Sequence, residues 1–152
     1  MRKVTWGMLG TATIAKRNTI AGMKKAPNCR LYAVAGRNPE KVDQYVKEYG
    51  FEKGYYSYEE LLDDPEIEAV YIPLPNHMHY EWVLKAVAKK KHVLCEKPLA
   101  PTAKEAQEMF DVAKENGIVK DGDCIIITAG VPLTKGANTN LMRIHTVGED
   151  LV

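Results

Sequence analysis

The chain has few of the features that direct a protein to membranes, nucleic acid or oxidising surroundings. Its 21 basic and 20 acidic residues leave a net charge of +1, which gives nucleic acid or an acidic membrane little to attract. No apolar run approaches the roughly 18 residues of a membrane-spanning helix, and residues 1–7 do not resemble a secretion signal. There are 3 cysteines and no Cys-x-x-Cys pair, which argues against a disulfide framework and structural zinc. We therefore expect a cytoplasmic protein without nucleic-acid or membrane partners, and its oligomeric state stays open.

The residues that are present alternate between short apolar runs and amphipathic, well-capped segments. This alternation is typical of βα units on a parallel sheet. Strands are predicted at residues 4–9, 30–35, 67–72 and 92–95, and the main helices at residues 13–25, 39–49, 76–90 and 102–117. The sequence thus predicts one α/β domain over residues 1–152, with an open, mostly parallel, Rossmann-like sheet in three layers.

The pattern changes after Gly117. Residues 124–128 form an apolar run and residues 141–147 alternate, with a Gly- and Pro-containing loop and no helix between them. The last strand is therefore predicted to be antiparallel, at an edge of the sheet. His145 lies on this strand and is expected at the surface or at an edge.

A glycine-containing turn follows the first predicted strand and opens a helix. Gly10 supplies a tight turn, while Ala12 and Ala15 stand at the second and third glycine positions of a dinucleotide fingerprint. In such a turn, backbone N–H groups and the positive end of the helix hold a pyrophosphate. The predicted cofactor contacts are Gly10, Thr11, Ala12, Thr13 and Ile14. The alternative is a compact strand–helix turn that needs glycine for packing alone.

The end of the second predicted strand bears on which dinucleotide would bind. An acidic residue there would hold a ribose hydroxyl and select NAD. This chain has Gly36, Arg37 and Asn38 instead, with no carboxylate before Glu40. An arginine can fork onto a 2′-phosphate, so these residues favour NADP over NAD. The alternative is that Arg37 faces solvent at the start of a helix.

Four segments together resemble the N-terminal domain of the glucose–fructose oxidoreductase / inositol dehydrogenase family. They are WGMLGTATIA at residues 6–15, GRNPEK at 36–41, PLPNHMH at 73–79 and HVLCEKP at 92–98. The resemblance implies that Leu74, Pro75, Asn76 and His79 line the nicotinamide-ribose side, with Glu96 and Lys97 beside the nicotinamide. It also implies that Lys97 is the catalytic lysine, which orients and polarises a substrate hydroxyl or carbonyl. Taken without the resemblance, residues 96–98 could be a plain strand-ending turn, and no metal site is predicted.

Residues 118–152 resemble a different family, namely the C-terminal end of pyruvate kinase. The resemblance rests on VKDGDCIIITAGVP at residues 119–132 and GANTNLMRI at 136–144. It implies an engineered chimera, in which residues 124–128 fill the slot of a lost fifth strand. It also places Thr134, Lys135 and Gly136 in a sugar-phosphate effector loop.

These resemblances lead to a functional expectation. We expect a chimeric scaffold without complete catalytic machinery or appreciable dehydrogenase turnover, and any NADP(H) binding that it keeps is expected to be weak. Two alternatives stay open: an NADP-dependent oxidoreductase with a reduced site that uses Lys97, and a sugar-phosphate effector-binding module.

Overall fold

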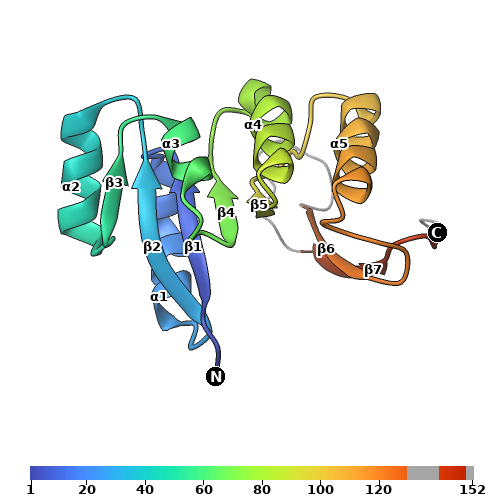
Figure 1. Cartoon of the computed structure of the whole chain (residues 1–152), viewed down its shortest axis with the longest axis horizontal. Helices are drawn as coiled ribbons and strands as arrows, with labels where there is room; N and C mark the ends of the chain where they lie inside the picture. The colour runs from blue at the N-terminus through green and yellow to red at the C-terminus, as the bar shows by residue number, and fades with distance from the viewer. Residues whose placement is uncertain (130–140, 150–152) are drawn as a thin grey trace.

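The computed structural model describes residues 1–129 and 141–149, apart from the side chains of Arg17, Asn18 and Ala129. Five parallel strands form one sheet in the order β3-β2-β1-β4-β5, and two further strands form an antiparallel hairpin (Figure 1). The strands are β1 (Val4–Leu9), β2 (Cys29–Ala35), β3 (Lys53–Tyr55), β4 (Ala69–Ile72), β5 (His92–Cys95), β6 (Cys124–Ala129) and β7 (Leu141–Thr146). The predicted α/β class with a mostly parallel, Rossmann-like sheet is confirmed. Among the described residues, no helix has the length and apolar character needed to cross a membrane.

In the part of the chain that the structure describes, six helical segments connect the strands. They are the π-helical turn η1 (Ala15–Thr19), α1 (Ile20–Lys25), α2 (Pro39–Tyr49), α3 (Tyr58–Asp63), α4 (Asn76–Ala88) and α5 (Ala103–Glu115). The start of α2 is fixed by Asn38, whose side-chain oxygen accepts a hydrogen bond from the Lys41 N–H at 2.9 Å. That helix ends at Gly50, whose φ of +68° is open to glycine without strain. A capping box formed by Ser57 and Glu60 is present at the start of α3.

The helices cover the two faces of the sheet unequally. On one face, η1, α1 and α2 pack over a cluster that includes Met8, Val34 and Tyr71. On the other face, α3, α4 and α5 pack over a larger cluster that includes Leu9 and Ile72. All four residues of β4 are buried, as expected for a strand between two helical layers.

Strand β3 and the division of the first helix were not predicted from the sequence. Strand β3 has only three residues, Lys53–Tyr55, and lacks an apolar run. It packs closely through Gly54, where a Cβ atom would lie 2.7 Å from a methyl group of Val42. The predicted continuous helix at residues 13–25 is in fact divided, because the backbone follows π-helical geometry over Ala15–Thr19 before α1 begins.

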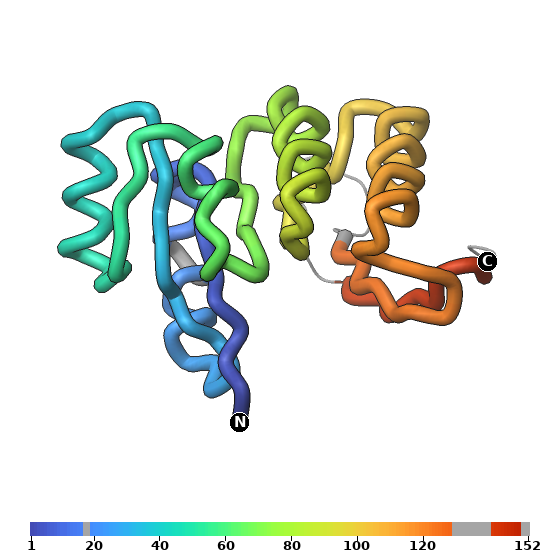
Figure 2. The backbone as a smooth tube through the Cα atoms, viewed as in Figure 1, coloured from blue at the N-terminus to red at the C-terminus, as the bar shows by residue number. Residues whose placement is uncertain are grey.

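The expectation that residues 124–128 fill a slot in the main sheet is wrong. Among the described residues, strand β6 pairs with β7 alone, in a separate two-stranded sheet whose register joins Cys124 to Thr146. Two backbone hydrogen bonds join the residues just before β6 to the residue just after β7. The Gly122 N–H donates to the Val147 oxygen, and the Val147 N–H donates to the Asp123 oxygen. Figure 2 shows this segment turning back below α5. His145 is buried, contrary to the expectation of a surface position, although its strand β7 is an edge of the two-stranded sheet, in line with the expected edge position.

Candidate functional site

The turns that follow the strands of the main sheet share one edge. All its strand pairs are parallel, so the turns after β1, β2, β4 and β5 leave the sheet at its carboxyl edge. The chain passes to one face after β1 and to the opposite face after β4, and these two strands are neighbours. Ligands of open α/β sheets bind at such a switch point. The candidate site therefore lies above the ends of β1 and β4.

The turn after β1 is built around Gly10. Its φ is +104°, and a Cβ atom there would lie 2.9 Å from a methyl group of Leu74. No other residue fits this backbone without strain. The Gly10 N–H donates to the Ala35 oxygen at 2.7 Å, which ties the turn to the end of β2. Thr11 and Ala12 are half-buried beside the turn, whereas Thr13 and Ile14 are exposed at the start of the following helix.

The turn after β2 meets the first turn through Gly36. A Cβ atom at Gly36 would lie 3.0 Å from Val42 and 3.5 Å from the methyl group of Thr11. Arg37 and Asn38 follow and are exposed. Within the part of the chain that the structure describes, Arg37 makes no ion pair, whereas the Asn38 side chain is used to cap α2. Arg37 is thus an available cation at the end of β2.

Tyr45 supports the first turn, a role that sequence reasoning missed. Its hydroxyl donates to the Ala12 oxygen at 3.1 Å, and the Lys16 ammonium lies 4.7 Å from the centre of its ring. Burial, with Tyr49 and Glu48 nearby, raises the pKa of Tyr45 to about 12, so its phenol remains a donor at neutral pH. The apolar pattern of α2 predicts that Tyr45 faces the core, but it does not show which backbone oxygen the Tyr45 hydroxyl reaches.

The turn after β4 and the helix that follows it contain two predicted site residues that are buried. Leu74 is buried against Gly10, and Pro75 and Asn76 are exposed. His79, however, is completely buried in α4. Its Nδ1 lies 2.7 Å from the Pro98 oxygen and its Nε2 lies 2.7 Å from the Leu74 oxygen. Both ring nitrogens of His79 therefore face the main chain.

The turn after β5 holds the two predicted residues of the nicotinamide side. Glu96 is half-buried, and its carboxylate accepts a hydrogen bond of 2.6 Å from the Tyr71 hydroxyl. Burial and this hydrogen bond raise the pKa of Tyr71 far above its ordinary value, so the phenol is the donor. Lys97 is exposed, and the Lys97–Pro98 peptide bond is cis. Tyr71 is a second residue that sequence reasoning missed, since it reads as an ordinary buried strand residue.

Contacts thus join the predicted site residues of the four turns. Gly36 lies against Thr11, Gly10 against Leu74, and His79 links Leu74 to Pro98. The described residues contain no group of three or more side chains suited to hold a metal ion. The arrangement offers a glycine turn, an available arginine and an exposed lysine along one edge.

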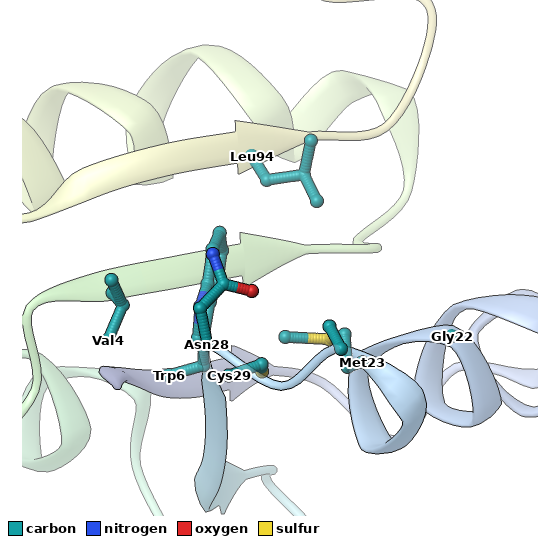
Figure 3. Close-up of a pocket in the computed structure, with 8 residues that line it drawn as sticks. Val4, Trp6, Gly22, Met23, Asn28, Cys29 and Leu94 are labelled. Carbon is teal, nitrogen blue, oxygen red and sulfur yellow. The ribbon is translucent and has the colours of Figure 1, made fainter. Parts of the chain in front are cut away.

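A separate hollow of about 290 Å³ lies towards the opposite ends of β1 and β2. Figure 3 shows Trp6, Met23 and Leu94 around it, with Val4 and Cys29 nearby. Its lining is mainly apolar and includes none of the predicted site residues. It lies beside α1, which contributes Gly22 and Met23 to its lining.

Comparison with known proteins shows that most of the chain matches a known protein family. Residues 4–120 match the model of the GFO/IDH/MocA group, described as the oxidoreductase family with an NAD-binding Rossmann fold. An uncharacterised oxidoreductase, ORF334 of Rhizobium meliloti, is 43% identical over 117 residues, which cover 77% of this chain and 35% of that protein. The dTDP-3,4-didehydro-2,6-dideoxy-α-D-glucose 3-reductase of Streptomyces antibioticus is 32% identical over 147 residues, which cover 97% of this chain and 44% of that protein.

A solved structure agrees with these sequence matches. KijD10, a 3-ketoreductase from Actinomadura kijaniata solved with NADP and TDP-benzene, superimposes with a TM-score of 0.74 and 33% identity. The match covers 76% of this chain and 35% of KijD10. The chain thus spans between a third and a half of the length of these relatives. The resemblance of residues 118–152 to pyruvate kinase gains no support from these matches, and Thr134, Lys135 and Gly136 lie outside the described residues.

Proposed function

Because the chain belongs to the oxidoreductase family with an NAD-binding Rossmann fold, we propose that it binds NADP(H) at the carboxyl edge of its sheet. We also propose that the residues assigned to this site do not make up the complete catalytic machinery of a sugar oxidoreductase. The match with KijD10 covers 35% of that protein. Hydride transfer needs a substrate held against the nicotinamide, and the residues that would hold it are not among those assigned to the site.

The observation that carries the choice of cofactor is the available Arg37 at the end of β2. Its guanidinium is exposed and makes no ion pair among the described residues, and no carboxylate stands beside it before Glu40. A guanidinium binds a phosphate through two parallel hydrogen bonds, which suits the 2′-phosphate of NADP. The NADP in the KijD10 structure supports the same choice.

The remaining residues fit the rest of the dinucleotide. The Gly10 turn lets a ligand approach the backbone closely, and the first N–H groups of the following helix have no partner within that helix. Residues 11–14 would hold the pyrophosphate, and Leu74, Pro75 and Asn76 would border the nicotinamide ribose. When bound, the cofactor supplies the hydride chemistry. Lys97 would orient a substrate hydroxyl or carbonyl next to it, with Glu96 at its side.

A titration with NADPH and NADH, followed by cofactor fluorescence and melting temperature, tests the proposal. Arg37→Asp removes the guanidinium that would bind the 2′-phosphate and places a carboxylate there, which repels that phosphate. NADPH affinity should therefore fall about tenfold or more, equivalent to roughly 1.4 kcal/mol. NADH affinity should stay the same or rise. Lys47→Asp is the matched control, because Lys47 is an exposed cation in the last turn of α2, the helix that begins just after Arg37. If Arg37→Asp leaves NADPH binding unaffected while NADH is still ignored, the assignment of Arg37 is wrong.

The exposed Lys97 favours one second candidate, an NADP-dependent oxidoreductase with a reduced active site. Turnover over a panel of sugars and polyols that disappears in Lys97→Ala would establish it. NADPH binding without turnover would instead support the non-catalytic proposal.

The pyruvate kinase resemblance of residues 118–152, and the chimera that it implies, stay predictions. Their functional consequence is the sugar-phosphate effector-binding module. A melting temperature raised by a sugar bisphosphate, and not by NADP(H), would favour that module over the dinucleotide site.

A further inference from the structure

The two residues next to Lys97, Glu96 and Pro98, each lie within hydrogen-bond distance of a buried side chain. On one side, the Glu96 N–H donates to the Ile72 oxygen at 3.1 Å, and the Glu96 carboxylate accepts from Tyr71 at 2.6 Å. On the other side, the Pro98 oxygen lies 2.7 Å from Nδ1 of His79. The Lys97 side chain itself is exposed between these two anchors.

The two anchoring side chains come from opposite faces of the sheet. Tyr71 packs in the cluster under η1 and α2, and its hydroxyl also lies 3.3 Å from Oγ1 of Thr19 in η1. His79 belongs to α4, which covers the other face. The turn that carries Lys97 is therefore restrained by side chains from both faces of the sheet.

His79 also connects this turn to the rest of the edge. A neutral imidazole donates from one nitrogen and a protonated one from both, so the ring can bond the Pro98 oxygen, the Leu74 oxygen or both. Leu74 in turn packs against Gly10, where a Cβ atom would lie 2.9 Å from a methyl group of Leu74. Displacing the His79 ring would thus loosen the contact between the β4 and β5 turns and remove the hydrogen bond that the ring donates to a main-chain oxygen.

We propose that Tyr71 and His79 are positioning residues that fix the backbone of Lys97 against the nicotinamide half of the dinucleotide site. The inference deepens the proposed function and rests on it. Neither side chain needs to touch the ligand, since each acts through a residue next to Lys97. Tyr71 holds Glu96 and His79 holds Pro98.

The test compares two ligands on the full chain. NADPH occupies both halves of the proposed site, whereas adenosine 2′,5′-bisphosphate lacks the nicotinamide half. Tyr71→Phe and His79→Gln should weaken NADPH binding about two- to tenfold, the range expected for losing one hydrogen bond. Their affinity for adenosine 2′,5′-bisphosphate should stay within about twofold of the unchanged chain, because the β1 and β2 turns are intact.

Matched variants separate positioning from general loosening of the fold. Tyr80→Phe removes a similar bond, from the Tyr80 hydroxyl to Glu108 at 2.7 Å, and should change neither affinity. His79→Asn places its amide nitrogen near the position of Nδ1 and should preserve more NADPH binding than His79→Gln. In a Lys97→Ala background, the effect of Tyr71→Phe on NADPH affinity should shrink towards none.

The outcomes distinguish the two proposals. If the unchanged chain binds neither ligand, the proposed function fails and the positioning role falls with it. If the unchanged chain binds both, but the variants weaken both ligands equally or neither, only the positioning role is overturned. Tyr71→Phe keeps the ring volume, so a melting curve close to that of the unchanged chain is expected and confirms that the comparison is made on folded protein.

Discussion

The main sheet and the hairpin contain similar apolar residues but bury them to very different extents. All of β4 is buried at 2% exposure or less. In the hairpin, Ile126, Met142 and Ile144 are 66%, 72% and 69% exposed. Their register places them on one face of the two strands. A strand buries both its faces only where helices cover both sides of its sheet, and the hairpin strands lack that cover among the described residues.

The same difference appears in weaker form within the main sheet. Strands β1 and β2 lie between helices on both faces, but Leu94 of β5 is 43% exposed beside the hollow near α1. The strand that leads into Lys97 has no buried residue, whereas its neighbour β4 is buried throughout. Side-chain anchors from Tyr71 and His79 matter more on such a strand, because packing restrains it less.

The largest expected effect separates two isoleucines. Ile72→Ala, at the fully buried end of β4, should lower the free energy of unfolding by about 2–5 kcal/mol through lost burial and a new cavity. Ile144→Ala, on the exposed face of the hairpin, should change it by about 0.5 kcal/mol or less. Urea denaturation followed by circular dichroism measures both. Equal costs would show that the two regions do not differ as described.

An intermediate effect is expected from Asp64, at the start of the loop into β4. Burial alone would raise its pKa, but hydrogen bonds from Tyr55 and the Glu66 N–H, with Lys53 nearby, lower it from 3.8 to about 2. The ionised form is therefore favoured by folding, and its contribution is present above pH 4 and lost as the pH falls from about 4 to about 2. Asp64→Asn should cost roughly 2 kcal/mol at neutral pH and flatten the acid dependence of the free energy of unfolding in that range.

An acidic residue beside the hairpin provides the control for Asp64. Asp121 forms an ion pair with Lys114 at 2.7 Å, but its side chain is largely exposed. Asp121→Asn should therefore lower the free energy of unfolding by less than about 1 kcal/mol, and this loss should become smaller in added salt. An acid-unfolding curve for Asp64→Asn that matches the unchanged chain would contradict the role given to the buried carboxylate.

These contrasts also explain how far the sequence could be interpreted. The fingerprint turn, the caps of α2 and α3 and four of the parallel strands follow from local residue patterns. The hairpin's separation from the sheet could not, because an apolar strand carries no mark of which edge it will join. Tyr45, Tyr71 and the burial of His79 depend on contacts between residues 19 to 33 positions apart, which a pattern along the chain does not specify.

The smallest expected effect compares two neighbouring residues of β6 that point to opposite faces of the hairpin. Ile126 is on the exposed face, whereas Ile125 lies opposite the buried His145. Ile126→Thr keeps the branched side chain suited to a strand and should change the free energy of unfolding by about 0.5 kcal/mol or less. It should also lower the fluorescence of a dye that binds exposed apolar surface. Ile125→Thr should cost more, since it puts a hydroxyl on the inner face, and should leave the dye signal unchanged. A cost for Ile126→Thr as large as that for Ile125→Thr would mean that both hairpin faces are covered in solution, and the contrast with the main sheet would then disappear.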